Sequence, residues 1–283
     1  MKKSRIPTIL LIFAFIAGLC LLLYPTVSDY WNSLHHSTAI NHYLNDVEQI
    51  DEEEYEALLE KARQYNRSLL NRPNQYTLTD QQSSEYPVLP YVSKDGVMGV
   101  VEIPSIGVTL PVYHGTSASV LQKAVGHLEW TSLPVGGEST HAVISGHRGL
   151  PSSKLFTDLD KLAVGDVFCV RVLNETVTYE VDQILIVEPA DTTALQITEG
   201  EDYCTLVTCT PYGINTHRIL VRGHRIENAA EARFIQISAD AVMIEPLMVA
   251  PVIFAGLLLI LLIVIALTPH SGKDDEENRY EEL

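Results

Sequence analysis

The sequence has few basic residues: 19 lysines and arginines stand against 36 aspartates and glutamates, a formal net charge of −17 at pH 7. Proteins that bind nucleic acid non-specifically neutralise phosphates with clustered lysine and arginine. The acidic balance therefore argues against nucleic acid as a partner and favours a basic one. Cys-x-x-Cys and His-Glu-x-x-His motifs are also absent, so we expect no metal site and no cofactor.

Long apolar runs, in contrast, are present at both ends of the chain. Hydrophobic residues make up 46% of the 283 residues, which excludes a disordered acidic protein. Residues 6–24 and 247–267 contain no charged side chain. At ~1.5 Å per residue, each run approaches the ~30 Å thickness of a bilayer's hydrocarbon core. The sequence therefore predicts two transmembrane helices.

The short flank before the first run is basic, with Lys2, Lys3 and Arg5. Such flanks usually remain in the cytoplasm, so the middle of the chain should be extracellular. A cleaved signal peptide is the alternative for the first run, but the residues after Leu23 lack a small-x-small cleavage pattern. We therefore expect a two-pass protein of the cell membrane, with an acidic cytoplasmic tail at residues 268–283.

The middle of the chain changes character near residue 95. Between Thr38 and Leu70, apolar residues recur every three to four positions, which predicts helices. Acidic residues 51–54 interrupt this pattern and are expected to form a turn or a helix N-terminus. Residues 71–95 have no such period and include three prolines, so we expect a long loop, of the kind that often forms a lid.

From Gly96 onward, short runs rich in valine and isoleucine are separated by glycine and proline, which indicates strands. The expected strands are residues 97–103, 108–113, 141–145, 167–173, 176–187, 203–209 and 218–222. Seven or eight short strands predict a mainly β fold, either a closed barrel or a sandwich. Short helical insertions are expected at 120–125 and 153–159. No segment is long enough for a βαβ array, which argues against a parallel nucleotide-binding fold.

Four cysteines are present, and Cys20 lies in the first apolar run. Cys169, Cys204 and Cys209 lie in the outer part, so at least one thiol there is free. Cys204 and Cys209 are five positions apart on one expected strand and should point to opposite faces, so they should not pair. A bond between Cys169 and Cys204 stays open; otherwise both are expected to be small core residues.

Cys209 differs because it ends an apolar run and is followed at once by Thr210 and Pro211. A thiol at the end of a strand, where the chain turns, is accessible to substrate. Its use as a nucleophile requires a nearby imidazolium or cation. The sequence offers three His-Arg dipeptides, beginning at residues 147, 217 and 224, and spacing alone does not choose among them.

Two segments resemble a known family. Residues 205–218, TLVTCTPYGINTHR, resemble the active-site signature of sortases, Thr-Leu-x-Thr-Cys followed by an arginine, and residues 141–149, HAVISGHRG, resemble the catalytic-histidine segment of that family. The resemblance covers residues 96–227. With Gly99, Ile103-Pro104, residues 133–137 and residues 154–156, it is similar to class C, pilin-polymerising sortases. The helical region before it and the second apolar run also suit that class.

The resemblance implies an eight-stranded sortase barrel with Cys209 as nucleophile, His147 as general acid/base and Arg218 as the cation beside the oxyanion. An imidazole can protonate a leaving amine and later accept a proton from an attacking one. Arginine stays charged and can hold carbonyl oxygens throughout. Thr208 and His217 should face the opposite side and are expected to be structural.

The resemblance also implies a substrate: a membrane-held pilin or surface-protein precursor with a C-terminal Leu-Pro-x-Thr-Gly-like sorting signal, cleaved between Thr and Gly. A pilin lysine would then resolve the thioester and form an isopeptide bond. One alternative is a sortase that anchors single proteins to the cross-bridge amine of peptidoglycan. A scaffold that binds sorting signals without turnover and a hydrolytic cysteine protease are the others.

One feature of class C sortases is missing. Their lid commonly carries an Asp-Pro-aromatic motif, whose Asp pairs with the active-site arginine and whose ring covers the thiol. The equivalent place here is residues 74–76, where Tyr76 offers the ring and Asn74 has no charge, while Asp80 could offer a carboxylate. Since Asn74 cannot form a charge-assisted bond to Arg218, we expect a weakly held lid. A surface loop without a gating role is the alternative.

The expected organisation follows from these observations. It comprises a cytoplasmic N-terminus (1–5), a transmembrane helix (6–24), an extracellular helical region with the lid (25–95), the catalytic barrel (96–228), a linker (229–246), a second transmembrane helix (247–267) and the cytoplasmic tail (268–283).

Overall fold

The computed structural model describes residues 6–70, 72, 76–86, 92–93, 95–228, 255–256, 258–260 and 263. By internal contacts it consists of two units, Met1–Val27 with Val242–Leu283, and Ser28–Ala241. The expected linker 229–246, the tail 268–283 and Asn74 lie outside the described residues. The second expected membrane helix, 247–267, does so too, apart from the few described helical positions from 255 to 263. The predicted domain boundaries therefore remain predictions.

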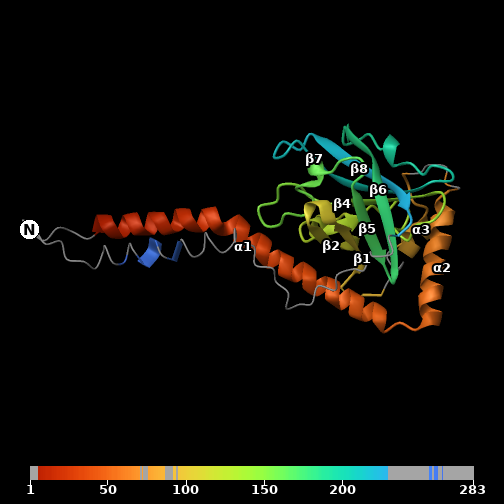
Figure 1. The fold of residues 1–283 in the computed structure, drawn as a ribbon, viewed down its shortest axis with the longest axis horizontal. Coiled ribbons are helices and arrows are strands. Elements are labelled where there is room, and N and C mark those ends of the chain that lie inside the picture. Colours follow the sequence, from red (N-terminus) through yellow and green to blue (C-terminus); the bar gives the residue numbers. More distant parts are fainter. Residues whose placement is uncertain are drawn as a thin grey trace, which may run out of the picture. The chain divides into compact units, whose positions relative to one another are not determined.

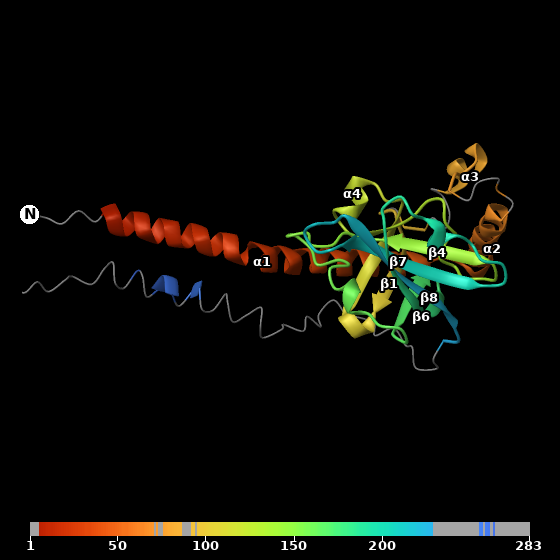
Figure 2. The same cartoon turned by 90° about the horizontal axis from the view of Figure 1, so that it is seen from above.

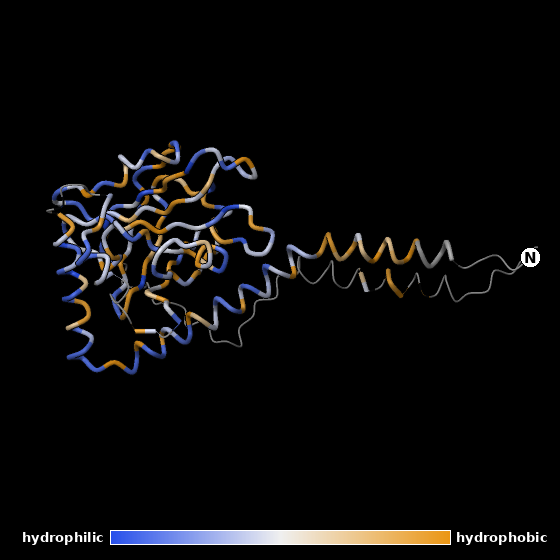
Figure 3. Tube along the Cα trace, turned by 180° about the vertical axis from the view of Figure 1, so that it is seen from behind, coloured by the Kyte–Doolittle hydropathy of each residue, from blue (hydrophilic) through white to orange (hydrophobic). Residues whose placement is uncertain are grey.

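Helix α1, Ile6–Glu48, is a single helix of 43 residues (Figure 1). Within the described part of the chain it is the one helix long and apolar enough to cross a membrane, and Figure 3 shows the hydrophobic colour gathered on its N-terminal portion. The helix continues beyond the predicted membrane span of residues 6–24, through Pro25. Proline removes one backbone N–H from the helix, and packing of the following segment on the barrel compensates for that loss.

The C-terminal part of α1 docks through one face. Tyr43 and Val47, four residues apart, are 0% and 2% exposed. The Tyr43 hydroxyl donates to the carbonyl oxygen of Met98 (3.1 Å) and accepts from the backbone N–H of Leu173 (2.7 Å). One buried side chain therefore satisfies two backbone groups from different parts of the barrel.

Earlier on the same face of α1, two polar side chains hold a loop of the barrel unit. The Asn32 amide donates to the carbonyl oxygen of Ser152 (2.6 Å), and the Asp29 carboxylate accepts from the backbone N–H of Lys154 (2.6 Å). The helix thus contacts both the core and an irregular loop that has few backbone partners of its own.

Two further helices precede the barrel. Helix α2 is Glu52–Leu69, and it is capped by Asp51, whose side chain accepts from the N–H of Glu54. The acidic run is therefore a helix N-terminus, one of the two structures expected for it. Helix α3, Asp80–Glu85, lies within the segment that the sequence predicted as a loop. Thr79 and Gln82 form a capping box at its start. That Thr-x-x-Gln spacing is the signal by which the helix could have been found.

Eight strands form a closed barrel in the order β1-β2-β3-β4-β7-β8-β6-β5, which confirms the predicted eight-stranded barrel; Figure 2 shows β4, β7 and β8 side by side. The strands are β1 Val97–Ile103, β2 Val108–His114, β3 Val125–His127, β4 Thr140–Ser145, β5 Val167–Val172, β6 Glu175–Val187, β7 Asp202–Thr210 and β8 His217–Ile226. One short helix, α4, is Ala118–Leu121. Short 3₁₀ turns are η2 Pro104–Ile106, η3 Leu159–Lys161 and η4 Thr193–Leu195. The β2–β3 and β4–β7 pairs are parallel, whereas the other pairs are antiparallel.

Two expected helices are wrong or misplaced. At 120–125 the helix α4 ends at Leu121, and β3 begins at Val125. A Cβ on Gly126 would lie 2.0 Å from the carbonyl oxygen of Gly115, so glycine permits this tight strand passage. Residues 153–159 form turns rather than a helix, and Leu155 has a positive φ of 38°. A left-handed residue interrupts a right-handed helix, and tertiary contacts hold the segment instead.

The four cysteines are free, so the disulfide that the sequence left open between Cys169 and Cys204 does not form. Cys204 is 0% exposed and belongs to the core, as expected. Cys169 is partly buried, and its sulfur lies 3.6 Å from the Thr178 hydroxyl.

The double role of Tyr43 generates a stability prediction. Tyr43→Phe should lower the thermal midpoint of the full-length protein, because a buried N–H and a buried C=O each lose their partner, at a cost of about 1–3 kcal/mol for an unpaired group. Tyr30→Phe, a change at a more exposed tyrosine of the same helix (37% exposed), is the control. Equal midpoints for the two variants in thermal unfolding followed by circular dichroism would contradict this role.

Candidate active site

Three neighbouring strands bring the predicted catalytic residues together. β4 and β7 are parallel, with Ser145 opposite Val207, and the ladder continues where the N–H of Gly146 donates to the carbonyl oxygen of Val207 (3.0 Å). His147, two residues past Ser145, is therefore level with Cys209, two residues past Val207. Across the next antiparallel pair, Cys209 lies opposite Arg218.

Opposed residues of a ladder point to the same face of a sheet. This register therefore places His147, Cys209 and Arg218 on one face, at the ends of β4, β7 and β8. All three side chains are partly buried, which leaves them accessible from solvent. The guanidinium of Arg218 is oriented by the β7–β8 turn, because its Nη1 donates to the carbonyl oxygens of Asn215 (3.3 Å) and His217 (3.0 Å).

The same register places the three His-Arg dipeptides at different positions on the sheet. His217 lies opposite Thr210, is exposed, and its Nδ1 contacts the hydroxyl of Thr216 (2.9 Å). His224 lies opposite Tyr203, near the other end of β7. His147 and Arg218 therefore come from different dipeptides, a combination that spacing along the chain does not reveal.

An apolar patch lies on this face, outside the barrel interior. Its buried members, here called the outer cluster, are Val143, Leu195, Val207 and Leu220. Leu128, Trp130, Leu185, Val187 and Ala194 pack against it. Val207 precedes Cys209 by two residues on the same face, so the outer cluster leads directly to the thiol.

The opposite face of the sheet supports the strand ends. The Thr208 hydroxyl donates to the carbonyl oxygen of Gly146 (2.7 Å), in agreement with the structural role expected for Thr208. A Cβ on Gly146 would lie 2.8 Å from both the Phe156 ring and Val125, so only glycine fits here without displacement. The N–H of Phe156 donates to the carbonyl oxygen of His147 (3.2 Å), which brings the following loop back to the histidine.

A buried histidine anchors the β6–β7 loop at the other end of this face. His141 is 1% exposed; its Nδ1–H donates to the carbonyl oxygen of Gln196 (2.9 Å), and its Nε2 accepts from the Thr205 hydroxyl (2.7 Å). Burial lowers the pKa of His141 to about 4. The ring is therefore neutral at pH 7, and its role here is to hold the loop.

The predicted lid residues are placed only in part. The Tyr76 ring packs edge-on against Trp130, with centroids 5.2 Å apart, and its hydroxyl accepts from the side-chain amide of Gln196 (2.6 Å). Tyr76 therefore lies at the border of the outer cluster. Asp80 is exposed in the first turn of α3 and takes part in none of the ion pairs found among the described residues.

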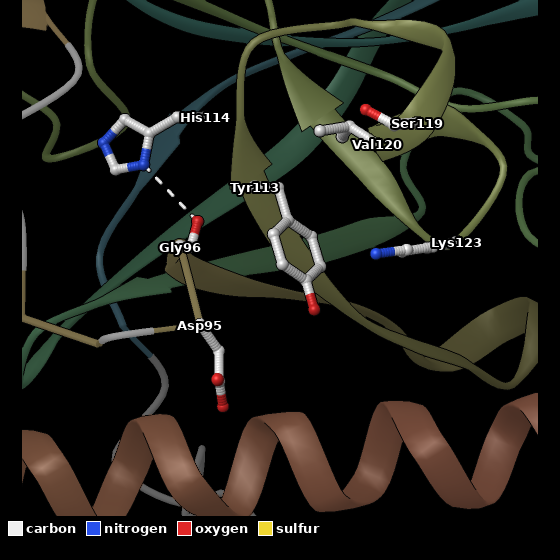
Figure 4. A pocket seen from close by; sticks show the side chains of 7 residues that line it. All are labelled: Asp95, Gly96, Tyr113, His114, Ser119, Val120 and Lys123. Carbon is white, nitrogen blue, oxygen red and sulfur yellow. Dashed lines mark hydrogen bonds between the residues drawn. The ribbon is translucent and has the colours of Figure 1, made fainter.

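A hollow of about 300 Å³ lies elsewhere, lined by Asp95, Gly96, Tyr113, His114, Ser119, Val120 and Lys123 (Figure 4). The Nδ1 of His114 is directed at the carbonyl oxygen of Gly96 (3.5 Å), and the Ser119 hydroxyl contacts that of Ser117 (2.9 Å). No thiol borders this hollow. We therefore place the candidate site at Cys209. Within the described ranges, no group of three or more His, Cys, Asp or Glu side chains could hold a metal ion.

Comparison with known proteins agrees with this geometry. A sortase-domain family profile matches residues 101–226. The structure of sortase C1 from Streptococcus agalactiae is 53% identical and has a TM-score of 0.66; the match covers 68% of this chain and all of that one. The chain belongs to the sortase family.

Two other sortase structures match over a similar extent. Streptococcus pneumoniae sortase C, a structure described as informative on pilin substrate specificity, is 47% identical over 68% of this chain and 97% of its own, with a TM-score of 0.61. Clostridium perfringens sortase C, solved with a C-terminal cell wall sorting motif, is 44% identical over 68% and 99%, with a TM-score of 0.60. These structural neighbours are class C sortases, in agreement with the class that the sequence predicted.

The residues that sequence reasoning missed come from loops. Trp130, Leu195 and Gln196 lie outside the strands, and no periodic pattern marks them. Arg148 was noted only as a neighbour of His147, yet its side chain is largely buried. Burial of a charged side chain is a tertiary property that composition does not reveal.

The lowered pKa of His141 generates a prediction about pH. Because the unfolded chain binds a proton near pH 6.5 and the folded protein near pH 4, stability should fall as the pH is lowered through this window. The expected loss between pH 7.5 and pH 5 is roughly 2 kcal/mol from this residue.

Thermal unfolding of the full-length protein at the two pH values tests it. His141→Gln should remove that part of the pH dependence, whereas His217→Gln, at an exposed position, should not. Equal pH dependence in the wild type and His141→Gln would contradict a buried neutral imidazole.

Proposed function

We propose that this sortase is a membrane-anchored cysteine transpeptidase of the pilin-polymerising type, with Cys209 as nucleophile, His147 as general acid/base and Arg218 as oxyanion cation. The observation that carries the proposal is the strand register: Arg218 lies opposite Cys209 on β8, and His147 follows the end of β4 by two residues, as Cys209 follows Val207, the partner of the last β4 residue. A thiol between an imidazole and a guanidinium has the neighbours that thiolate chemistry requires.

The first half of the reaction is acyl transfer to the enzyme. The Cys209 thiolate attacks the threonine carbonyl carbon of a Leu-Pro-x-Thr-Gly-like sorting signal, and the negative charge that develops on the oxygen faces Arg218. His147, protonated, donates its proton to the glycine nitrogen as the carbon–nitrogen bond breaks. The glycine-bearing fragment leaves as an amine, and a thioester on Cys209 remains.

The second half reverses the proton flow. A pilin lysine, in its neutral form, attacks the thioester carbonyl, and His147 accepts the proton that the amine loses. The Cys209 thiolate then departs, and an isopeptide bond between threonine and lysine is formed. The two halves together return Cys209 and His147 to their starting protonation states, so no metal or cofactor enters this scheme.

The proposed binding surface for the apolar part of the sorting signal is the layer of partly exposed side chains that packs on the outer cluster, among them Leu128, Trp130 and Val187. It runs along the face that ends at Cys209, so a peptide lying on it would present its later residues to the thiol. Burial of leucine and proline side chains there would supply binding energy at ~25 cal/mol per Å² of apolar surface removed from water. Pilin and surface-protein precursors are the proposed partners, because the class C neighbours are described with pilin substrates or with a sorting motif.

We further propose that the protein is a two-pass membrane protein with its catalytic barrel outside. The long apolar part of α1 supports the first anchor, and the second rests on the charge-free run 247–267 in the sequence. Confinement of enzyme and precursor to one membrane surface raises their effective concentration. The amine acceptor decides between the polymerising sortase and one that attaches single proteins to peptidoglycan.

The experiment that tests the function uses the full-length protein in lipid nanodiscs with a purified pilin precursor, and Cys209→Ala as the control. We expect a ladder of covalent products with Thr-to-Lys isopeptide bonds, read by denaturing gel and mass spectrometry, which Cys209→Ala does not form. Transfer only to a peptidoglycan cross-bridge amine would indicate an anchoring sortase instead. Release of free acid alone would indicate a protease, and the absence of covalent product with several pilins would indicate a scaffold.

The segment around Tyr76 is the proposed lid, with Asn74 and Asp80 as predicted members. The Tyr76 ring packs against Trp130 and its hydroxyl bonds Gln196, so these contacts hold the segment at the border of the outer cluster. Tyr76→Ala should therefore raise the rate at which a sorting-signal peptide is cleaved, by roughly 5-fold or more if both contacts are lost. Gln196→Ala should act in the same direction but more weakly.

Peptide cleavage and alkylation of Cys209 measure the effect of these variants. Tyr55→Phe, which removes a tyrosine hydroxyl that bonds Glu175 on β6, is the matched control. If Tyr76→Ala changes neither rate, the segment is a surface loop.

A further inference from the structure

The position of His147 depends on a loop. β4 ends at Ser145, and residues 147–156, here called the His147 loop, leave the strand and return until the N–H of Phe156 donates to the carbonyl oxygen of His147 (3.2 Å). A second bond, from the N–H of Gly149 to the Thr157 hydroxyl (3.1 Å), lies just beyond this neck. The register of β4 and β7 fixes where the loop begins, but contacts of the loop itself must orient the imidazole.

Arg148 supplies such a contact. Arg148 lies in the bend that follows β4, and its side chain is only 8% exposed. It bonds Thr210, which alternates with Cys209 along β7 and so faces the opposite side of the sheet. Its Nη1 donates to the hydroxyl of Thr210 (3.1 Å), and its Nη2 pairs with the carboxylate of Asp160. Thr210 directly follows Cys209, so this side chain crosses from the histidine's loop to the nucleophile's strand.

A second bond joins the residues that come directly before Cys209 and His147. Thr208, which precedes Cys209, donates to the carbonyl oxygen of Gly146, which precedes His147. Each of the two residues that flank His147 is therefore bonded to one of the two residues that flank Cys209. Two such ties behind the sheet restrain sliding and separation of the two catalytic side chains in front of it.

Packing of the β7–β8 turn strengthens the tie. The guanidinium carbon of Arg148 lies 5.9 Å from the centroid of the Tyr212 ring, and a Cβ on Gly149 would lie 3.0 Å from that ring. The His147 loop and the turn after Cys209 are therefore in contact through their own side chains, and Arg148 lies at that contact.

Stability alone is a poor explanation for this arrangement. A buried ion pair adds little net stability, because desolvation of the charges offsets their attraction. Here Asp160 is 42% exposed while Arg148 is largely buried, and the Nε of Arg148 finds no hydrogen-bond acceptor among the described residues. The geometry that the pair imposes is its clearer consequence.

We propose that Arg148 is a positioning residue, which fixes His147 within reach of Cys209 by tying the His147 loop to Thr210. This inference rests on the proposed roles of His147 and Cys209. Without the tie, the imidazole moves away from the thiol, and both proton transfers slow down. Substrate binding on the outer cluster, on the other face of the sheet, is left largely intact.

The experiment compares full-length Arg148→Met and Arg148→Lys in detergent micelles. Methionine fills much of the same volume without donors, while lysine keeps the charge and one donor group. Arg67→Met is the matched control, since Arg67 forms an exposed ion pair with Glu60 away from the site. The readouts are thermal unfolding, kcat and KM for cleavage of a sorting-signal peptide, and the pH dependence of Cys209 alkylation by iodoacetamide, with the labelled cysteine identified by mass spectrometry.

We expect Arg148→Met to lower kcat by about 10- to 100-fold, because displacement of a catalytic group by about 1 Å has effects of this size, while KM changes by less than about 3-fold. The pH profile of alkylation should shift toward that of an isolated thiol, and Arg148→Lys should recover part of both losses. Arg67→Met should behave as the wild type.

Three results would overturn the proposal: a kcat for Arg148→Met within 2-fold of the wild type at ~25 °C, a rise in KM without loss of kcat, or an unshifted alkylation profile in protein that unfolds cooperatively. If Arg148→Met does not fold, Thr210→Val, which removes only the hydroxyl that accepts from Arg148, takes its place with the same criteria. Alkylation needs neither pilin nor lysine, so it reports on this inference even if the wild-type protein fails to polymerise pilin.

Discussion

The parallel pairing of β4 with β7 is the constraint on which the candidate site depends. Ser145 opposite Val207 sets the level of His147 against Cys209, and the antiparallel β7–β8 pair sets Arg218 beside Cys209. A slip of one residue in either ladder would turn a whole strand over, so that the thiol and its partners would face opposite sides. Because the inner face carries buried apolar residues such as Leu206 and Val221, the core itself opposes that slip.

The two faces of this sheet carry two separate clusters of apolar side chains. The inner face contributes to the barrel core, and the outer face carries the outer cluster and, at one end, the three predicted catalytic side chains. At the other end, a neutral buried His141 joins the β6–β7 loop to the strands through Gln196. The side chain of Gln196 also bonds Tyr76. The surface proposed for the sorting signal is thus bordered by the β6–β7 loop and by Tyr76, and both are bonded through Gln196.

Helix α1 connects the core to the loop that carries His147. Tyr43 is buried among barrel residues and bonds two of their backbone groups, while Asn32 and Asp29 bond the backbone of Ser152 and Lys154. The His147 loop is therefore held near its tip by α1 and near its neck by Arg148. A side chain on an irregular loop needs such supports to keep a fixed position, because loops lack the repeated backbone bonds that hold strands in place.

The sequence by itself determined much of this protein. Short runs rich in valine and isoleucine, separated by glycine and proline, predicted seven of the eight strands, and the segments around Cys209 and His147 pointed to the family. It missed β3, three residues long and held by pairing on both sides, and it placed a helix at 153–159, where tertiary contacts override local preference. Only the tertiary structure decided that the strand register brings the predicted His147, Cys209 and Arg218 near one another, that Arg148 is largely buried, and that Tyr76 contacts Trp130 and Gln196. These outcomes depend on which segments distant in the chain become neighbours, and local periodicity carries no information about that pairing.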